Sequence, residues 1–262
     1  MDFVLVIVAA AVASGLTMFS GFGLGTLLLP VFALFLPVEL AVAATALVHG
    51  ANNVLKAGLL GKLADFKIVL RFGLPAIVAA FAGVYVLKLL SGMTELWTYS
   101  LLGRQAVVTP LKLAMAALMT GFAVIELHPR FEKLEIDRRW LLLGGVLSGF
   151  FGGLSGHQGA LRSAFLAKVG ISPQAFVGTN AVIGLLVDLV RISAYAAILF
   201  GAHLTDMAKS REGALIAVGA MAAFAGVIIG KRVLHKITMA TVQRITGAML
   251  LVIALLLGLG VI

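Results

Sequence analysis

Polar residues that could bind an anion interrupt a nearly unbroken apolar stretch in the second half of the chain. They are Ser155, Gly156, His157, Gln158 and Arg162. Such groups are costly in lipid, so they usually line a pathway or a site. A helix beginning near His157 would offer free N–H groups and a partial positive charge, with Ser155 as its N-cap. Gln158 and Arg162 are four residues apart and share a helix face, and the arginine fork suits a sulfonate, carboxylate or phosphate.

A second glycine-rich break lies near the start of the chain. It contains Ser20, Gly21 and Gly23, but apolar Leu24 and Leu28 stand where the second break is polar. Two broken apolar segments in matching halves indicate the binding site of a transporter, whose specificity would come mainly from the second half. The alternative is that these glycines only allow close packing between helices.

Two further sets of polar residues have helical spacing, one in each half of the chain. The first set is Thr45, His49, Asn52 or Asn53, and Lys56, and the second is Thr179, Asn180, Asp188, Arg191 and Tyr195. Spacings of three and four place such residues on one stripe of a helix. Asp188 and Arg191 either neutralise each other or serve function, and Lys56 and Arg191 could instead reach toward an interface. His49 either carries a proton or hydrogen-bonds between helices.

Composition predicts an all-α polytopic membrane protein. The chain is 61% hydrophobic and 12% charged, whereas soluble domains are about 25% charged. Apolar segments of spanning length recur throughout and predict about eight transmembrane helices. The segments 23–36 and 158–169 are shorter and each follows a glycine break, so we expect half-helices there. The net charge of +9 reflects basic residues between apolar segments, which orient a membrane protein and do not indicate nucleic acid.

Repetition within the sequence predicts two halves, 1–127 and 140–262, joined by a cytoplasmic loop at 128–139. Residues 79–84 reappear unchanged as residues 222–227, which indicates duplication. The connection after the third apolar segment is basic, while its counterpart in the second half is less so. Basic loops lie in the cytoplasm, so the repeats should be inverted, with both termini outside.

The glycine-rich segments resemble the sulfite exporter TauE/SafE family over nearly the whole chain. The resemblance rests on residues 21–30, 44–46, 153–166, 178–180 and 187–191. It implies a multi-pass carrier of the bacterial inner membrane for small sulfur-containing anions, such as sulfite or organosulfonates including sulfoacetate. It implies no ATP hydrolysis. The first half lacks a basic residue beside its glycine break, so the resemblance does not imply a symmetric anion clamp.

Two other functions stay open on the sequence alone. One is an anion channel. The other is a rhomboid-type intramembrane protease, whose Gly-x-Ser-Gly serine site residues 153–156 resemble; that chemistry needs a histidine base within reach, and His157 is only two residues from Ser155. We expect a non-enzymatic secondary transporter without cofactor or metal, because no histidine has a second ligand at suitable spacing. Its partners would be a small anionic substrate and the lipid bilayer. The sequence leaves open a homodimer, the direction of transport, and whether protons drive it.

Overall fold

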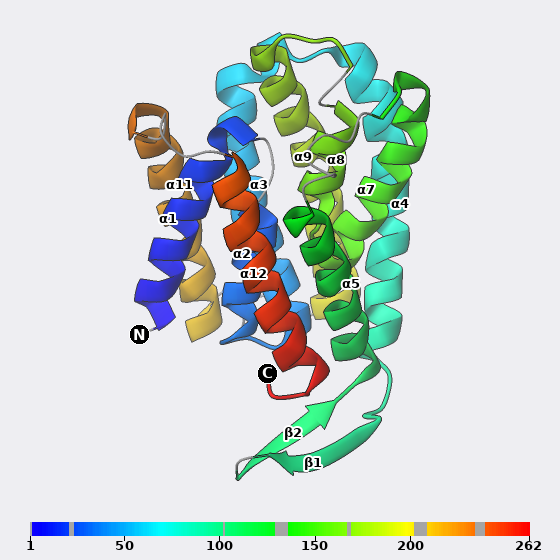
Figure 1. Ribbon diagram of the computed structural model, residues 1–262, viewed down its shortest axis with the longest axis vertical. Helices are drawn as coiled ribbons and strands as arrows, with labels where there is room; N and C mark the ends of the chain where they lie inside the picture. Colours follow the sequence, from blue (N-terminus) through cyan, green and yellow to red (C-terminus); the bar gives the residue numbers. More distant parts are fainter. Residues whose placement is uncertain are drawn as a thin grey trace.

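The structure of the protein is a computed structural model that describes residues 2–20, 24–101, 103–128, 136–166, 169–201, 209–233 and 239–262. Its elements in chain order are α1 (Asp2–Ser20), α2 (Leu24–Ala33), α3 (Val38–Leu60), η1 (Gly61–Leu63), α4 (Phe66–Ser91), β1 (Trp97–Leu101), β2 (Arg104–Val108), α5 (Pro110–Leu127), η2 (Arg138–Trp140), α7 (Leu141–Ser155), α8 (Gln158–Leu166), α9 (Pro173–Tyr195), the π-helical turn η3 (Ala196–Phe200), α11 (Arg211–Val233) and α12 (Met239–Gly258). Figure 1 shows them as one bundle.

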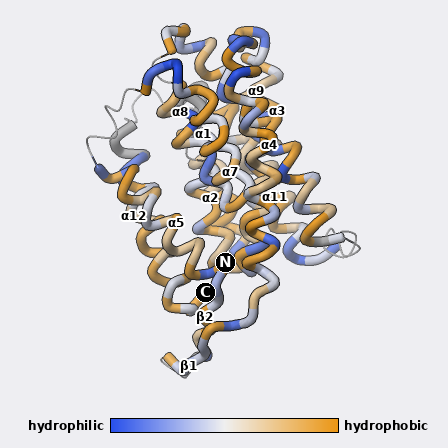
Figure 2. Tube along the Cα trace, turned by 90° about the vertical axis from the view of Figure 1, so that its right-hand side faces the viewer, coloured by the Kyte–Doolittle hydropathy of each residue, from blue (hydrophilic) through white to orange (hydrophobic). Residues whose placement is uncertain are grey.

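Most of this chain is helical because a backbone in lipid must satisfy its own polar groups. Among the residues searched, five helices are long and apolar enough to cross a membrane, and three shorter apolar helices accompany them. Local signals set several starts: Asp65 caps α4, Thr109 caps α5 and Ser172 caps α9, each by accepting from backbone N–H groups. Hydrophobic residues run along the helices, whereas hydrophilic stretches gather mainly at the connections (Figure 2). The predicted all-α polytopic membrane fold is confirmed.

The two halves are inverted with respect to each other. In Figure 1, α1, α3 and α5 run away from the end that carries both termini, whereas α7, α9 and α12 run toward it. The helices α4 and α11, which contain the repeated six-residue string, also run in opposite directions. Packing follows the same symmetry: α4 lies against α7 as α11 lies against α1, while α3 meets α9 and α5 meets α12. The inverted repeat is therefore confirmed. The boundaries 1–127 and 140–262 stay a prediction, and residues 129–135 lie outside the described ranges.

The repeated segments 79–84 and 222–227 pack against a neighbouring helix in the same way. A Cβ atom added to Gly83 on α4 would lie 2.1 Å from the carbonyl oxygen of Phe150 on α7. A Cβ atom added to Gly226 on α11 would lie 2.2 Å from the carbonyl oxygen of Ala11 on α1. The backbones approach so closely that only glycine fits, as is typical of membrane helix interfaces.

A β-hairpin, which the sequence interpretation did not predict, extends from the bundle at the end that carries the termini (Figure 1). Its antiparallel strands β1 and β2 pair from Trp97 with Val108 to Leu101 with Arg104. The hairpin is tied to the end of the chain, because the Val107 N–H donates to the Gly260 carbonyl at 3.0 Å.

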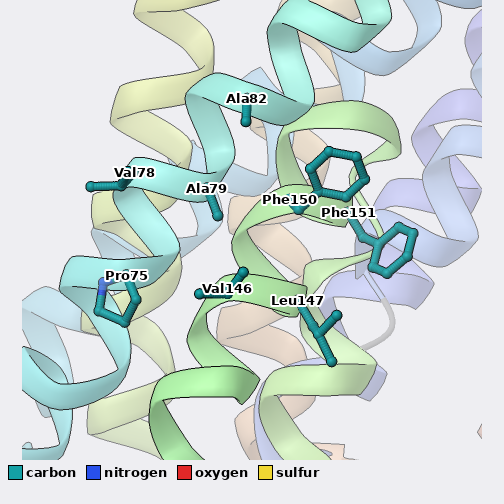
Figure 3. A pocket seen from close by; sticks show the side chains of 8 residues that line it. All are labelled: Pro75, Val78, Ala79, Ala82, Val146, Leu147, Phe150 and Phe151. Carbon is teal, nitrogen blue, oxygen red and sulfur yellow. The ribbon is translucent and has the colours of Figure 1, made fainter.

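An apolar groove of about 620 Å³ lies between α4 and α7. Figure 3 shows the side chains that line it: Pro75, Val78, Ala79, Ala82, Val146, Leu147, Phe150 and Phe151. None of these side chains can bind an anion by charge or by a polar hydrogen bond. The groove therefore belongs to the apolar exterior of the bundle, whereas the buried polar side chains lie deeper inside it.

Candidate anion-binding site

The two helix breaks meet inside the bundle. The chain leaves α7 at Ser155, turns at Gly156 with φ of +82°, and starts α8 at Gln158. In the first half α2 starts at Leu24, and a Cβ atom added to Gly25 would lie 3.0 Å from the Gly156 carbonyl oxygen. The predicted half-helices are confirmed, and their N-terminal ends lie together. N-terminal ends of helices attract anions.

Gly21 and Gly23 lie outside the described residues, as does the side chain of Ser20. Their predicted contribution to the site stays a prediction.

Ser155 does not cap the second half-helix, contrary to the sequence prediction. It is the last residue of α7, and its hydroxyl donates to the Phe151 carbonyl at 3.1 Å. Gly156 ends that helix in the left-handed conformation that favours glycine. The chain needs both Gly156 and His157 to change direction, so Ser155 stays on the preceding helix. The Ser155 hydroxyl also lies 3.0 Å from His157 Nδ1.

Asp188 on α9 is the centre of the polar cluster. Asn53 Nδ2 donates to Asp188 Oδ2 at 2.7 Å, and His49 Nδ1 lies 2.7 Å from the same oxygen. Gln158 Nε2 donates to Asp188 Oδ1 at 2.8 Å, and Arg191 Nε donates to that oxygen at 2.9 Å. The carboxylate is fully buried, and buried charges require such partners. One residue therefore joins α3, α8 and α9, which come from both halves.

Arg191 places its guanidinium beside the second helix break. Its Nη2 lies 2.8 Å from Asp188 Oδ1 as an ion pair, and its Nη1 donates to the Gly152 carbonyl at 3.2 Å. A Cβ atom added to Gly156 would lie 3.1 Å from Nη1. Arg191 is fully buried, and among the described residues Nη2 has no partner other than the Asp188 carboxylate. Asp188 and Arg191 therefore form a buried ion pair, and one N–H group of Nη2 can still donate to a further acceptor.

Arg162 forms a second buried cationic centre one turn along α8. Its Nε donates to Asn180 Oδ1 at 2.8 Å, and its Nη1 donates to Gln158 Oε1 at 3.1 Å. The predicted shared face of Gln158 and Arg162 is thus confirmed. Arg162 is 1% exposed, yet both partners are neutral amides, and no ion pair to it occurs among the described residues. Lys56 on α3 is also buried and has contacts of its own.

Two predicted residues, Thr45 and Thr179, have their hydroxyls engaged by the backbone. The Thr179 hydroxyl accepts from the Asp65 N–H at 2.9 Å, beside the start of α4. The Thr45 hydroxyl donates to the Ala41 carbonyl of its own helix at 2.8 Å. The Thr45 methyl would lie 3.8 Å from a Cβ atom added to Gly25, so Thr45 lines the meeting point with an apolar group. Thr179 instead fixes a connection between helices.

Three further side chains, Phe122, Ser148 and Tyr195, support the second helix break. The Phe122 ring stacks on the His157 ring, with centroids 4.8 Å apart and planes 10° apart. The Tyr195 hydroxyl donates to the Gly153 carbonyl, and the Ser148 hydroxyl donates to the Gln158 carbonyl. Tyr195 belongs to the predicted polar stripe of the second half, where it lies one helical turn beyond Arg191. Nothing in the sequence distinguishes Phe122 from the other phenylalanines of the apolar segments.

The arrangement suits anion binding better than catalysis. Ser155 and His157 are in contact, as the protease alternative requires, but they are 0% and 1% exposed. The serine hydroxyl is directed at a backbone carbonyl, whereas a nucleophile must reach its substrate. In the described part of the chain, no group of three His, Cys, Asp or Glu residues could hold a metal ion. What converges here is two guanidinium groups, two helix N-termini and one carboxylate.

Comparisons with known proteins identify the family of the chain. No curated protein and no solved structure matches the chain significantly. The model of a family described as sulfite exporter TauE/SafE matches residues 5–257 of the 262. The match covers both helix breaks and the whole polar cluster. The protein is therefore a multi-pass membrane protein and belongs to the sulfite exporter TauE/SafE family of membrane transporters.

Proposed function

We propose that this protein is a secondary transporter of small sulfur-containing anions, such as sulfite or an organosulfonate like sulfoacetate, in the bacterial inner membrane. The substrate binds between the two repeats, where α2 and α8 begin. The observation that carries the proposal is the charge of the buried cluster. Arg162 and Arg191 are both 1% exposed or less, and Asp188 is the only carboxylate described beside them.

An anion would correct this imbalance. Unpaired buried charge is costly, and an oxyanion supplies several acceptor oxygens for charge-assisted hydrogen bonds. Arg191 Nη2 has the Asp188 carboxylate as its partner among the described residues, and the second of its two N–H groups can donate to an anion. The N-terminal ends of α2 and α8 add partial positive charge from two sides. A sulfonate or sulfite is small enough to be held by these groups without a metal ion.

The inverted repeat provides a path for alternating access. Asp188 is held by His49 and Asn53 from the first half and by Gln158 and Arg191 from the second. The cluster therefore joins the two units that must move against each other when a carrier opens to one side and then the other. An anion bound at this junction would become accessible to each side in turn.

A binding screen on purified protein tests the proposal. Sulfite, sulfoacetate, taurine, thiosulfate and sulfate are titrated by calorimetry, and we expect saturable binding of at least one sulfur anion. Arg162→Gln should weaken that binding more than tenfold, because hydrogen bonds to charged groups contribute about 1.5–3 kcal/mol. Arg139→Gln is the matched control, since Arg139 is exposed. Equal affinity in both variants would place the anion elsewhere, and no binding of any of these anions would refute the proposed substrate class.

Transport in proteoliposomes separates a carrier from a channel. A carrier exchanges external labelled anion for internal unlabelled anion and saturates with concentration. A channel conducts without such counterflow. Counterflow by the wild type supports the carrier, and a current without counterflow would favour the anion channel.

A further inference from the structure

Glu126 is a buried carboxyl group that the proposed anion site does not use. It is 6% exposed and lies in the last turn of α5. Neither of its carboxyl oxygens has a hydrogen-bond partner among the described residues. An ionised carboxylate without a partner is costly in such surroundings. A bound proton would remove that cost.

The position of Glu126 follows the buried stripe of α5. That stripe runs through Leu111, Met115, Met119, Phe122 and Glu126 at spacings of three and four residues. The helix has 18 residues, compared with 26 in α4, and Figure 1 shows it ending within the height of the bundle. The carboxyl group therefore points into the protein, where a leucine or methionine would satisfy packing.

Aromatic rings connect this stripe to the anion site. Phe122, one turn before Glu126, stacks on His157 and contacts Phe151 edge-on with ring centroids 5.5 Å apart. His157 Nε2 is buried and has no hydrogen-bond partner among the described residues. His157 is adjacent to Gln158, which holds Asp188. A change at the end of α5 can thus reach the second helix break through one pair of rings.

The opposite helix α12 contributes another unsatisfied polar group. Thr246 is 1% exposed, and its hydroxyl has no partner among the described residues. Its neighbour Gly247 packs on α5, because an added Cβ atom would lie 2.5 Å from Leu127 Cγ. Glu126 and Thr246 therefore lie on packed segments of two helices that correspond in the inverted repeat.

Few other charged groups face this end of α5. On α12 the charged residue in the described range is Arg244, which is exposed, and α7 has no titratable residue. His157 faces α5 from the break, as described above. On α4, which also contacts α5, Tyr85 and Lys88 are exposed. Beyond the helix end, His128 is exposed and has contacts of its own. No ion pair to Glu126 occurs among the described residues.

We propose that Glu126 is the proton-binding residue that couples transport to a proton gradient. This proposal rests on the proposed anion carrier and names its coupling site. Glu126 takes up a proton from one side of the membrane and releases it to the other during the transport cycle. Its charge state acts on the anion site through Phe122 and His157, and the anion binds separately from the proton, at the α2–α8 junction.

The test compares two kinds of flux in proteoliposomes that contain the purified protein. The transported anion is the one that binds most tightly in the calorimetric screen. Counterflow exchange needs no net proton movement, whereas accumulation driven by an imposed pH gradient does. We expect wild-type protein to perform both. Glu126→Gln imitates the protonated form and should retain exchange but lose at least nine-tenths of the gradient-driven accumulation. Glu95→Gln, in an exposed connection, should retain both.

The outcomes separate the two proposals. Gradient-driven accumulation that persists in Glu126→Gln overturns the coupling role of Glu126. Wild-type exchange without any response to a pH gradient also overturns it, but leaves the anion carrier intact. Absence of both fluxes in wild-type protein overturns the proposed carrier itself.

A chemical measurement on the wild type covers the case in which Glu126→Gln does not fold. Hydrophobic carbodiimides modify protonated carboxyl groups buried in membrane proteins, and peptide mass spectrometry locates the modified residue. We expect modification at Glu126 that decreases as pH rises. Absence of modification at Glu126 across the pH range in which the protein transports would overturn the proposal.

Discussion

The half-helices α2 and α8 share a position in the repeat but differ in chemistry. Described residues of α2 include one polar side chain, Thr26, whereas α8 carries Gln158, Arg162 and Ser163. Both begin at the same meeting point inside the bundle. The duplicated fold thus provides two equivalent scaffolds, and the second one alone supplies the charged side chain. The symmetry of the backbone does not extend to the site.

Where α3 packs against α9, the two halves again contribute different kinds of side chain. The first half contributes His49 and Asn53, which bind the carboxylate. The second half contributes Asp188 itself and its ion-pair partner Arg191. Each set of side chains would be poorly satisfied without the other, because a buried carboxylate needs its donors. Contacts between the halves therefore stabilise the bundle and also define the site.

The largest expected effect is on stability, from removing the charge partner of Asp188. Arg191→Ala should lower the free energy of unfolding by about 3–5 kcal/mol, because it leaves a buried acid without its ion pair. The measurement is unfolding by a denaturing detergent in mixed micelles. Arg139→Ala, which affects an exposed pair with Asp137 at 3.9 Å, should change stability little. An Arg191→Ala protein as stable as the wild type would contradict this account.

A double variant that exchanges Asp188 and Arg191 tests whether the pair does more than neutralise its two charges. In the double variant Asp188→Arg with Arg191→Asp, Asn53 and Gln158 would direct donor groups at a guanidinium instead of a carboxylate. The pair would be neutral, yet these donors would have lost their acceptor. We expect the double variant to be at least as unstable as Arg191→Ala. Recovery of wild-type stability would show that neutralisation is the only role of the pair.

A smaller effect is expected at the two copies of the repeated string. Gly83→Ala and Gly226→Ala should each destabilise by about 1–3 kcal/mol, because the new methyl group would force neighbouring backbones apart. The two losses should be similar, since both glycines meet a carbonyl oxygen at nearly the same distance. Gly121→Ala on α5 is the control, as nothing lies within 4 Å of its added Cβ atom. Unequal losses of stability would show that the contacts of Gly83 and Gly226 are not equivalent.

The sequence predicted the fold well because its signals were local. The glycine breaks and apolar lengths predicted the half-helices, the repeated string predicted the duplication, and the charges of the connections predicted the inversion. The β-hairpin was missed because five-residue strands at the surface carry little pattern, and its attachment to Gly260 joins distant parts of the chain. Long-range contacts of this kind cannot be obtained from spacing along one helix.

The residue types of the candidate site could be predicted from the sequence, but most of their hydrogen-bond partners could not. Gln158, Arg162 and the Asp188–Arg191 pair follow from helical spacing, which alone determines a shared face. The link from His49 and Asn53 to Asp188 depends on how α3 crosses α9, which no local spacing contains. Ser155 was misassigned because a serine before a helix resembles an N-cap, whereas two residues of turn separate it from α8. Thr179 lies on the predicted polar stripe of α9, but its hydroxyl accepts a hydrogen bond from the Asp65 N–H and does not face the cluster around Asp188.

The difference between the half-helices should also appear in anion affinity. Gln158→Ala should weaken binding about tenfold, because its amide positions both Asp188 and Arg162 and one charge-assisted hydrogen bond contributes about 1.5–3 kcal/mol. Thr26→Val, a change of similar shape in α2, should leave affinity unchanged. Calorimetry on monodisperse protein measures both. A loss with Thr26→Val equal to that with Gln158→Ala would mean that both half-helices bind the anion through side chains.

The smallest effect is expected at Ser155, which separates a packing role from a catalytic one. Its hydroxyl donates to the Phe151 carbonyl of its own helix and contacts His157. Ser155→Ala removes both contacts, but the Phe151 carbonyl keeps its place in the helix, so we expect a loss of about 1 kcal/mol or less. Anion exchange should continue at nearly the wild-type rate, because the carrier needs the turn at Gly156 and not a nucleophile. Wild-type protein and Ser155→Ala should both leave a transmembrane reporter peptide uncleaved in the same vesicles. Cleavage by the wild type that disappears in Ser155→Ala would instead identify a serine protease at this helix break.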